Sequence, residues 1–286
     1  MQLPKPAVGA ASALFSCAAL SASLLFASHV NAADNYTPDE PAPEAAVDRH
    51  DFSRFDYIAE TLAGWKVVIG AGGIVGPKFE GAKRFEIDPV PLFLAEFGRV
   101  SVDPRGVSVK VVEFENFSFA ARGGYDLGRD DSDDRHLRGL GDIDAGGVVG
   151  ATAAYDLGPV KFSAALDKTI GGSDGLTGVL GAEASHMFGP VILTAGASAT
   201  WADDNHMEDY FGVTRRQSAR SGLSRYKAEA GIKRVDVQAS ATYLIDQHWL
   251  VRGQAGVSYL VGDAGDSPIV QRKTQPSGML MVGYRF

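Results

Sequence analysis

Strict alternation of apolar and polar residues at the C-terminus most constrains what this chain can fold into. The last ten residues are SGMLMVGYRF, in which every second position counted from the end is apolar or aromatic: Phe286, Tyr284, Val282 and Leu280. A period of two is typical of a β-strand with two different faces. A terminus that is not part of the fold is usually frayed and polar. The pattern therefore predicts a structural strand that ends at Phe286.

The N-terminus has the pattern of a secretory signal. Lys5 precedes an apolar stretch rich in Ala, Ser and Leu, and Val30-Asn31-Ala32 places suitable residues before a cleavage site after Ala32. Cys17, the one cysteine, lies in this segment, so no disulfide is expected in the mature chain. Residues 33–63 are acidic and Pro-rich, which favours a flexible leader. The predicted organisation is a signal peptide (1–32), a periplasmic leader (33–63) and a β-barrel (64–286).

The segment 248–261, HWLVRGQAGVSYLV, indicates which environment the strands occupy. Trp249 and Tyr259 lie ten residues apart on its apolar face. That separation is ~34 Å along a strand at ~3.4 Å per residue, and roughly 26 Å along the membrane normal at a tilt of ~40°, close to the ~25 Å apolar band between two aromatic girdles. No later stretch has the ~18–20 apolar residues of a membrane helix. We expect an aromatic girdle that includes Trp249, Tyr259, Tyr243 and Tyr284.

The same alternation along the chain predicts an all-β transmembrane antiparallel barrel of about twelve strands, within limits of ten and fourteen. The strands are expected at 64–74, 85–96, 99–103, 107–112, 116–126, 143–156, 160–170, 176–188, 191–201, 225–245, 248–261 and 274–286. The phase of alternation slips near Lys233-Arg234, which predicts a β-bulge within one long strand. With the C-terminus periplasmic and the periplasmic turns short, the loops 127–142 and 202–224 are then on the outside.

Polar side chains at alternate positions predict the inner face of the barrel. Mixed charges suit a wet or ion-paired lumen. The expected lumen-facing residues are Lys110, Arg122, Lys161, Asp167, Glu183, Lys227, Glu229, Asp236, Arg252 and Gln254.

No linear motif predicts an enzyme. The stretch GAGGIVGPK (70–78) lacks the spacing of a nucleotide-binding loop, and GDSP (265–268) is followed by no histidine. The acidic runs 130–134 and 203–209 are expected to be solvated loops, with rim cations as the alternative. The net charge of −8 argues against nucleic acid as a partner. We therefore expect a non-enzymatic protein without cofactor, catalytic residues or metal site.

Three segments resemble the MltA-interacting protein/OmpV family of Gram-negative outer-membrane proteins. They are YFGV (210–213) with QS (217–218) and SGL (221–223), GDAGDSPIV (262–270), and the terminal GYRF (283–286). The similarity runs from about Gly64 to Phe286, and the leader lies outside it. The family carries no agreed catalytic residues, so none are transferred to this chain.

The resemblance implies a barrel in the outer membrane, in contact with the bilayer and lipopolysaccharide. It implies a scaffolding role that holds a murein lytic transglycosylase near a murein synthase. It also implies that Tyr284 and Phe286 form a signal for the barrel-assembly machinery. The alternatives are a small-solute pore or uptake channel, which the charged inner face favours, and a surface adhesin acting through the outer loops.

Overall fold

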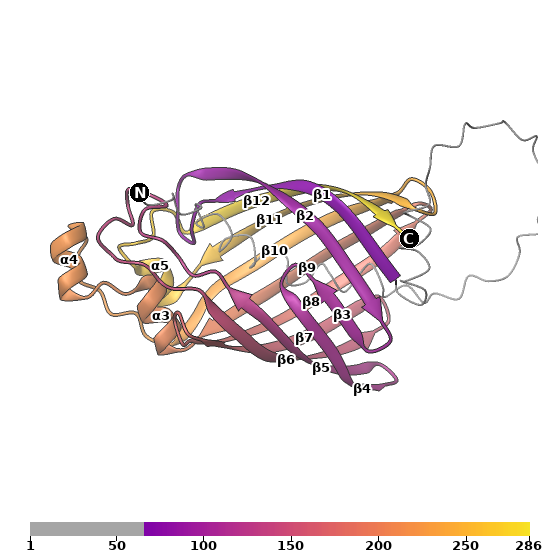
Figure 1. The fold of residues 1–286 in the computed structure, drawn as a ribbon, viewed down its shortest axis with the longest axis horizontal. Coiled ribbons are helices and arrows are strands. Elements are labelled where there is room, and N and C mark those ends of the chain that lie inside the picture. Colours follow the sequence, from indigo (N-terminus) through magenta and orange to yellow (C-terminus); the bar gives the residue numbers. More distant parts are fainter. Residues whose placement is uncertain (1–65) are drawn as a thin grey trace, which may run out of the picture.

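The alternating segments of residues 66–286, the part of the chain that this computed structural model describes, close into a barrel of twelve antiparallel strands (Figure 1). Each strand pairs with the next along the chain, and β1 pairs with β12 to close the ring. The strands are β1 (Lys66–Pro77), β2 (Phe85–Phe97), β3 (Val100–Asp103), β4 (Gly106–Phe114), β5 (Phe117–Asp126), β6 (Gly146–Leu157), β7 (Val160–Ile170), β8 (Leu176–Phe188), β9 (Val191–Ala202), β10 (Gly231–Leu244), β11 (Trp249–Leu260) and β12 (Thr274–Arg285).

The predicted fold class and strand number are confirmed, and the largest error in strand bounds is in β10. That strand begins at Gly231, whereas the sequence predicted a start at 225. The predicted bulge is present, because the pairing of β10 with β9 shifts register between Ile232 and Arg234. The residues before it leave the wall instead: Tyr226 bridges to Val213, and Ala228 is fully buried among outer-loop side chains. The predicted signal peptide and leader lie outside the described residues.

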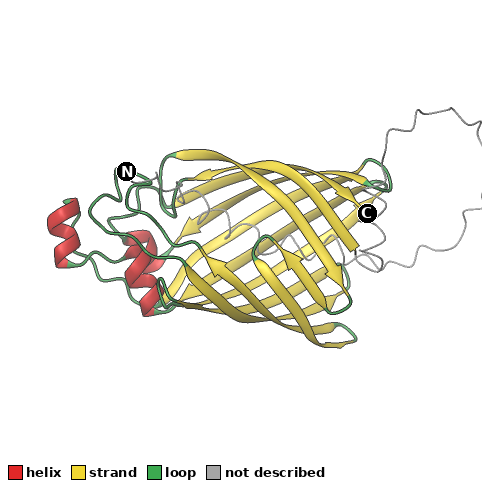
Figure 2. Cartoon of the chain, in the orientation of Figure 1, coloured by secondary structure: helices red, strands yellow, loops and turns green. Residues whose placement is uncertain are grey.

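The outer surface of the barrel is apolar. Leu180, Val237 and Leu280 are each more than 60% exposed although they are large hydrophobic side chains. Contiguous exposure of this kind is rare on water-soluble monomers and is the pattern of a lipid-facing barrel. The connections at one end are all short, whereas the long connections β5–β6, β9–β10 and β11–β12 all lie at the other end (Figure 2). By the usual asymmetry of bacterial barrels, the end with the short turns and the C-terminus is periplasmic.

Three short helices lie in the long outer connections, where the sequence predicted plain loops. They are α3 (Asp204–Phe211), α4 (Arg215–Ser221) and α5 (Gly262–Asp266). Local capping explains the first two. The Asp203 side chain accepts a hydrogen bond from the His206 N–H, and Thr214 and Gln217 form a capping box. None of the helices in residues 66–286 is both long enough and apolar enough to cross a membrane.

The outer connections pack on one another and cover that end of the barrel. One cluster joins Phe79 and Ala82 of the β1–β2 connection to residues of three others: Leu137, Leu140, Val213 and Ile269. A second cluster places Met207 and Phe211 of α3 against Ala264 of α5 and the barrel ends Ala202 and Leu260. These side chains are almost completely buried, so the outer loops form a folded cap.

Candidate functional site: the barrel interior and its two ends

Near its periplasmic end the barrel interior contains an apolar cluster. Its buried members face inward from β1, β2, β11 and β12: Val68, Leu92, Leu94, Leu250 and Met281, with Val90, Leu244 and Met279 packed against them. Side chains that are at most 9% exposed form a packed core on this side of the barrel. The sequence analysis did not identify this cluster, although these residues occupy the inward positions of the alternating pattern.

Halfway along the wall, Arg122 and Asp167 form an ion pair that spans three strands. Arg122 of β5 and Asp167 of β7 both lie opposite Gly150 of β6. The Arg122 Nε lies 3.1 Å from the Asp167 Oδ1. A methyl group on Gly150 would collide with the Asp167 carboxylate. The glycine therefore makes room for the ion pair to cross the intervening strand.

On the opposite wall, β8 to β11 present a second polar group to the interior. Arg252 donates a hydrogen bond from Nη1 to the Thr242 hydroxyl at 3.0 Å. The Gln254 side-chain amide donates from Nε2 to the Gln238 Oε1 at 3.0 Å. Glu183 is 3% exposed and lies beside Gly196, which has no side chain to displace it. The middle of the interior therefore carries paired and buried polar groups.

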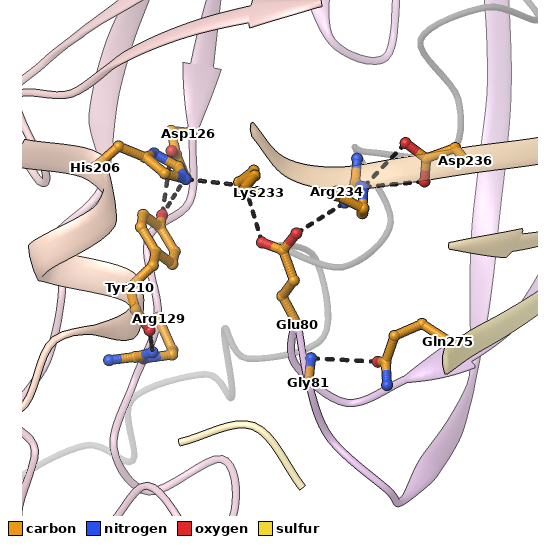
Figure 3. A network of polar contacts seen from close by, with 10 residues as sticks. All are labelled: Glu80, Gly81, Asp126, Arg129, His206, Tyr210, Lys233, Arg234, Asp236 and Gln275. Carbon is orange, nitrogen blue, oxygen red and sulfur yellow. Dashed lines mark hydrogen bonds and ion pairs between the residues drawn. The ribbon is translucent and has the colours of Figure 1, made fainter. Parts of the chain in front are cut away.

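At the outer end, Glu80 of the β1–β2 connection lies between two cations of β10 (Figure 3). Its Oε2 is 2.9 Å from the Lys233 Nζ, and its Oε1 is 3.1 Å from the Arg234 Nη1. Arg234 also contacts Asp236 at 3.0 Å. The bulge at Lys233 explains this geometry, because it lets two consecutive side chains reach one carboxylate.

The same network continues into α3. The Lys233 ammonium lies 2.9 Å from the His206 Nε2, and the His206 ring stacks on Tyr210 at 4.5 Å. The Tyr210 hydroxyl donates to the Asp126 carboxylate at 3.2 Å. Arg129 donates from Nη1 to the Tyr210 carbonyl oxygen at 2.8 Å. These contacts, shown in Figure 3, tie together four segments of the outer cap.

Burial and charge shift the pKa values of the network outside the strands. Burial alone would raise the pKa of Glu80, but Lys233 and Arg234 outweigh it and lower the pKa to about 2. Burial, together with Lys233, holds the pKa of His206 well below its usual range. Burial and the Asp126 carboxylate raise the pKa of Tyr210. At neutral pH the network therefore holds an ionised glutamate and a neutral histidine that accepts from Lys233.

The connection that carries Glu80 is also fixed at its other end. The Gly81 N–H donates to the Gln275 side-chain oxygen at 3.3 Å, and the Gln275 amide donates to the Ala82 carbonyl at 3.1 Å. Gly81 has φ of +99°, and a Cβ there would meet Val270. The β1–β2 connection is thus held by β10 on one side and by β12 on the other.

Eight of the ten predicted lumen residues lie on strands, and all but Gln254 of these eight are charged. Lys110 pairs with Glu96 at 3.6 Å and Lys161 with Asp156 at 3.7 Å, while the remaining six occur in the groups described above: Arg122, Asp167, Glu183, Asp236, Arg252 and Gln254.

The prediction for Lys227 and Glu229 was wrong. Both precede β10, and their mutual ion pair of 3.2 Å is more than two-thirds exposed. They alternate with buried Ala228 and partly buried Tyr226, which pack into the cap. An amphipathic loop segment thus has the same period of two as a strand, and it extended the strand prediction by six residues.

The predicted girdle residues occupy the outward face at two levels. Trp249 pairs with Tyr284 across β11 and β12, with their rings 5.1 Å apart, and Tyr243 lies on the same side at the periplasmic end of β10. Tyr259 lies at the outer end of β11. The Tyr284 ring also contacts Phe286 at 5.0 Å. Further exposed aromatics that the sequence analysis did not include occupy the periplasmic level: Phe97, Phe114, Phe117, Tyr155 and Phe188.

One predicted acidic loop brings three carboxylates together. Asp130, Asp131 and Asp142 have ligand atoms within 4.8 Å of one another. The Asp131 Oδ2 accepts hydrogen bonds from the N–H groups of Gly139 and Gly141, and Asp142 accepts from the Asp131 N–H. Backbone hydrogen bonding therefore accounts for this cluster as a loop-folding element. In the other acidic run, Asp203 is used as the N-cap of α3.

Two curated relatives from Escherichia coli are similar to part of this chain. The putative outer membrane protein YiaT of Escherichia coli K12 is 30% identical over 159 residues, which cover 54% of this chain and 63% of that protein. The MltA-interacting protein of Escherichia coli K12 is 29% identical over 161 residues, with the same coverage of 54% and 63%. The chain thus aligns with less than two-thirds of the length of either relative.

Solved structures that resemble this chain include outer-membrane proteins. The translocator domain of the autotransporter NalP from Neisseria meningitidis has a TM-score of 0.36 and 13% identity, covering 82% of this chain and 94% of that one. The outer-membrane OmpT of Vibrio cholerae has a TM-score of 0.34 and 9% identity, covering 78% and 98%.

The barrel, its lipid-facing surface and its relatives place the protein in the outer membrane of a Gram-negative bacterium. The family model of the MltA-interacting protein MipA matches residues 69–286, which include all but the first three residues of β1 and everything after them. The chain belongs to the MltA-interacting protein MipA family.

Proposed function

We propose that this protein is a non-enzymatic outer-membrane scaffold for peptidoglycan-remodelling enzymes. Its partners would be a lytic transglycosylase of the MltA type and a murein synthase. The name of the family and of one relative, MltA-interacting protein, supports the first of these partners. Insertion would use the barrel-assembly machinery through Tyr284 and Phe286, and the outer face would contact lipopolysaccharide.

The observation that carries the scaffold over a channel is the apolar cluster near the periplasmic end. Leu250 and Met281 are buried against Val68 and Leu92, in positions where a water-filled pore would present polar side chains. At the other end the outer loops form two packed clusters above the strands. Packed apolar side chains near both ends of the barrel suit a protein whose work is done on its surface.

The periplasmic turns offer a rigid surface for such contacts. In the turn between β10 and β11, Asp246 accepts hydrogen bonds from the N–H groups of His248 and Trp249, both at 2.7 Å. Arg285 fixes the same turn by donating from Nη2 to the Gln247 carbonyl at 2.8 Å. Together with the leader 33–63, which lies outside the described residues, these turns form the proposed contact surface for periplasmic enzymes.

A small-solute channel is the second candidate, and the polar groups in the middle of the interior favour it. Glu183 and Arg252 are buried there, and each retains a side-chain atom without a hydrogen-bond partner among the described residues: Glu183 Oε2 and Arg252 Nε. Conduction would require a path past the apolar cluster. The two candidates therefore differ in whether the resting barrel conducts.

A binding measurement with the purified full chain in lipid nanodiscs tests the scaffold. We expect saturable binding of a purified MltA-type lytic transglycosylase, weaker binding after deletion of 33–63, and no binding to an unrelated outer-membrane barrel in the same nanodiscs. Absence of binding to the full chain would contradict the scaffold. Undiminished binding after the deletion would remove the leader from the proposed surface and leave the turns.

A further inference from the structure

Most of β2 has a paired neighbour on one side only. β1 pairs with all of β2 from Phe85 to Phe97, whereas β3 pairs only with Ala95, Glu96 and Phe97. Within residues 66–286 no strand pairs with the other edge of 85–94. Figure 1 shows β2 running well beyond the short hairpin of β3 and β4. The ring of twelve strands is therefore incomplete toward its outer end.

The interruption has defined limits. On the periplasmic side, the unpaired stretch ends at the β3–β4 turn. Arg105 and Asp103 form an ion pair of 3.1 Å there, and the Tyr125 hydroxyl donates to the Pro104 carbonyl at 2.9 Å. On the outer side, the unpaired stretch ends where Arg84, just before β2, lies 3.8 Å from Asp134 of the β5–β6 connection. Contacts thus frame the open edge on both sides.

The sequence of this edge keeps it open. Antiparallel partners alternate between hydrogen-bonded and non-bonded pairs, and Phe97 and Val100 close a two-residue turn. Odd-numbered residues of β2 therefore direct their backbone groups toward the β3 side. Pro89 and Pro91 occupy two of these positions, and proline in a sheet is confined to edges because it lacks an N–H. Another strand could not form a complete hydrogen-bond ladder with this edge.

The prolines also determine the chemistry of the edge. Between Ile87 and Phe93 it presents four carbonyl oxygens but only two N–H groups. Unsatisfied backbone groups are costly in hydrocarbon, so an edge at membrane depth needs a ligand, water or protein to satisfy it. An edge rich in acceptors is best satisfied by a donor-rich group, and an ammonium offers three donors and no acceptor.

The two faces of β2 beside the open edge differ in polarity. On the lipid side, Ile87 is 76% exposed, and Phe85 and Phe93 are also exposed along the same face of β2. On the inward face, Glu86 and Asp88 place two carboxylates beside the edge, and Lys78 contacts Glu86 at 3.2 Å. A molecule at this edge would meet hydrocarbon on one side and net negative charge on the other.

We propose that the open edge of β2 is a lateral binding site and portal for an amphipathic cation, an amine with a hydrocarbon chain. Its chain would lie among Phe85, Ile87 and Phe93, and its ammonium would donate to the carbonyl oxygens and to Asp88. The site opens toward the outer leaflet rather than along the barrel axis. It is independent of the scaffold role, which uses the periplasmic end.

Photolabelling of the mature chain in liposomes tests the site. The probes are dodecylamine with a diazirine in its alkyl chain and dodecyl sulfate with the same diazirine. Trypsin releases the open edge as 85–99 and a fully paired lipid-facing control, mostly β10, as 235–252. We expect the ratio of labelling between these two peptides to be several-fold higher for the amine than for the sulfate. Equal ratios for the two probes would overturn the proposal, because the edge would then show no preference for a cation.

A variant adds a second readout. The pair Glu86→Gln and Asp88→Asn removes both inward carboxylates and keeps their shape, and it should lower amine labelling of 85–99 toward the value for the sulfate. Asp246→Asn, in a periplasmic turn far from the edge, should leave labelling unchanged. Undiminished amine labelling in the double variant would refute the charge assignment. If that variant fails to fold, the comparison of the two probes on the unmodified chain decides alone.

Discussion

Lys233 and Glu80 are separated by 153 positions in the sequence and meet at the outer end of the barrel, with 2.9 Å between Nζ and Oε2. Lys233 is part of the β10 bulge, and Glu80 is on the connection that β12 also holds. The contact joins the wall to the cap. It is buried, so its removal should affect stability far more than the loss of a surface pair.

Replacing Glu80→Gln should destabilise the cap by about 3 kcal/mol, because Lys233 and Arg234 would be left as buried cations without their shared carboxylate. The measurement is urea unfolding of the refolded barrel, in which the folded fraction is monitored by its heat-modifiable mobility on gels. Glu229→Gln is the matched control. It breaks the exposed pair with Lys227, and its effect should be below about 1 kcal/mol. Equal losses of stability in the two variants would show that the buried contact contributes no more to stability than the exposed pair.

Acidification should loosen the cap in two stages. His206 has a lowered pKa, so the unfolded state takes up its proton first and stability falls as the pH drops below about 6.5. Glu80 has its pKa lowered from 4.5 to about 2, so its contribution is present above 4.5 and is lost as the pH falls from 4.5 toward 2. Hydrogen exchange of residues 203–230 between pH 7.5 and 4 measures the first stage.

His206→Gln is the control for that experiment. It should remove the change between pH 7 and 5.5 and leave the change at lower pH. Protection that stays constant from pH 7.5 to 4 in the unmodified protein would contradict the assigned direction for His206.

Gly150→Ala should cost about 1–3 kcal/mol, because the new methyl group would collide with the Leu166 carbonyl oxygen and with the Asp167 carboxylate, and would displace Asp167 from Arg122 in a mostly buried ion pair. Gly147→Ala on the same strand meets nothing within 4 Å and should be neutral or stabilising by less than about 1 kcal/mol. Thermal unfolding of both variants makes the comparison. A larger loss for Gly147→Ala than for Gly150→Ala would refute the role given to this glycine.

The apolar cluster should limit conduction. Leu250→Ser combined with Met281→Ser places two polar side chains in the periplasmic cluster and should produce frequent opening events in planar bilayers, whereas the unmodified protein stays closed. Leu280→Ser and Val282→Ser, on the lipid face of β12, are the matched control and should not conduct. Steady conductance of the unmodified barrel would favour the channel over the scaffold.

Phe286→Ala should lower the amount of assembled barrel in the outer membrane if the terminal aromatic is read during insertion. Phe114→Ala removes another exposed aromatic, which is 66% accessible at the end of β4, and should have a smaller effect. Quantification of folded barrel in isolated outer membranes, with equal synthesis of all chains, makes the test. Equal yields for Phe286→Ala and the unmodified chain would contradict the signal.

The architecture could be predicted because side chains along a barrel strand alternate between the lipid and the interior, so apolar and polar residues alternate in the sequence with a period of two. The lipid-facing Val237 and the inward Gln238 alternate as strictly in the sequence as in the structure. Even the bulge at Lys233 was visible as a slip of phase. The side-chain contacts between distant strands could not be predicted. Glu80 meets Lys233 only because of the register of distant strands, and Arg122 reaches Asp167 only because Gly150 lies between them.

The outer cap was harder to predict for a related reason. Asp203 and Thr214 cap α3 and α4 with side chains that are also common in loops, and the sequence analysis predicted a plain loop over 202–224. The open edge of β2 was not predicted. Pro89 and Pro91 are unusual in a strand, but only the pairing of β3 shows that they face an unpaired side.

The most direct test of the scaffold is affinity capture of the mature protein from chemically crosslinked cell envelopes, with mass spectrometry of the captured proteins. The scaffold predicts recovery of a lytic transglycosylase and a murein synthase well above the amounts captured with an unrelated outer-membrane barrel. Recovery of barrel-assembly components and lipopolysaccharide alone, with both murein enzymes at the control level, would contradict it.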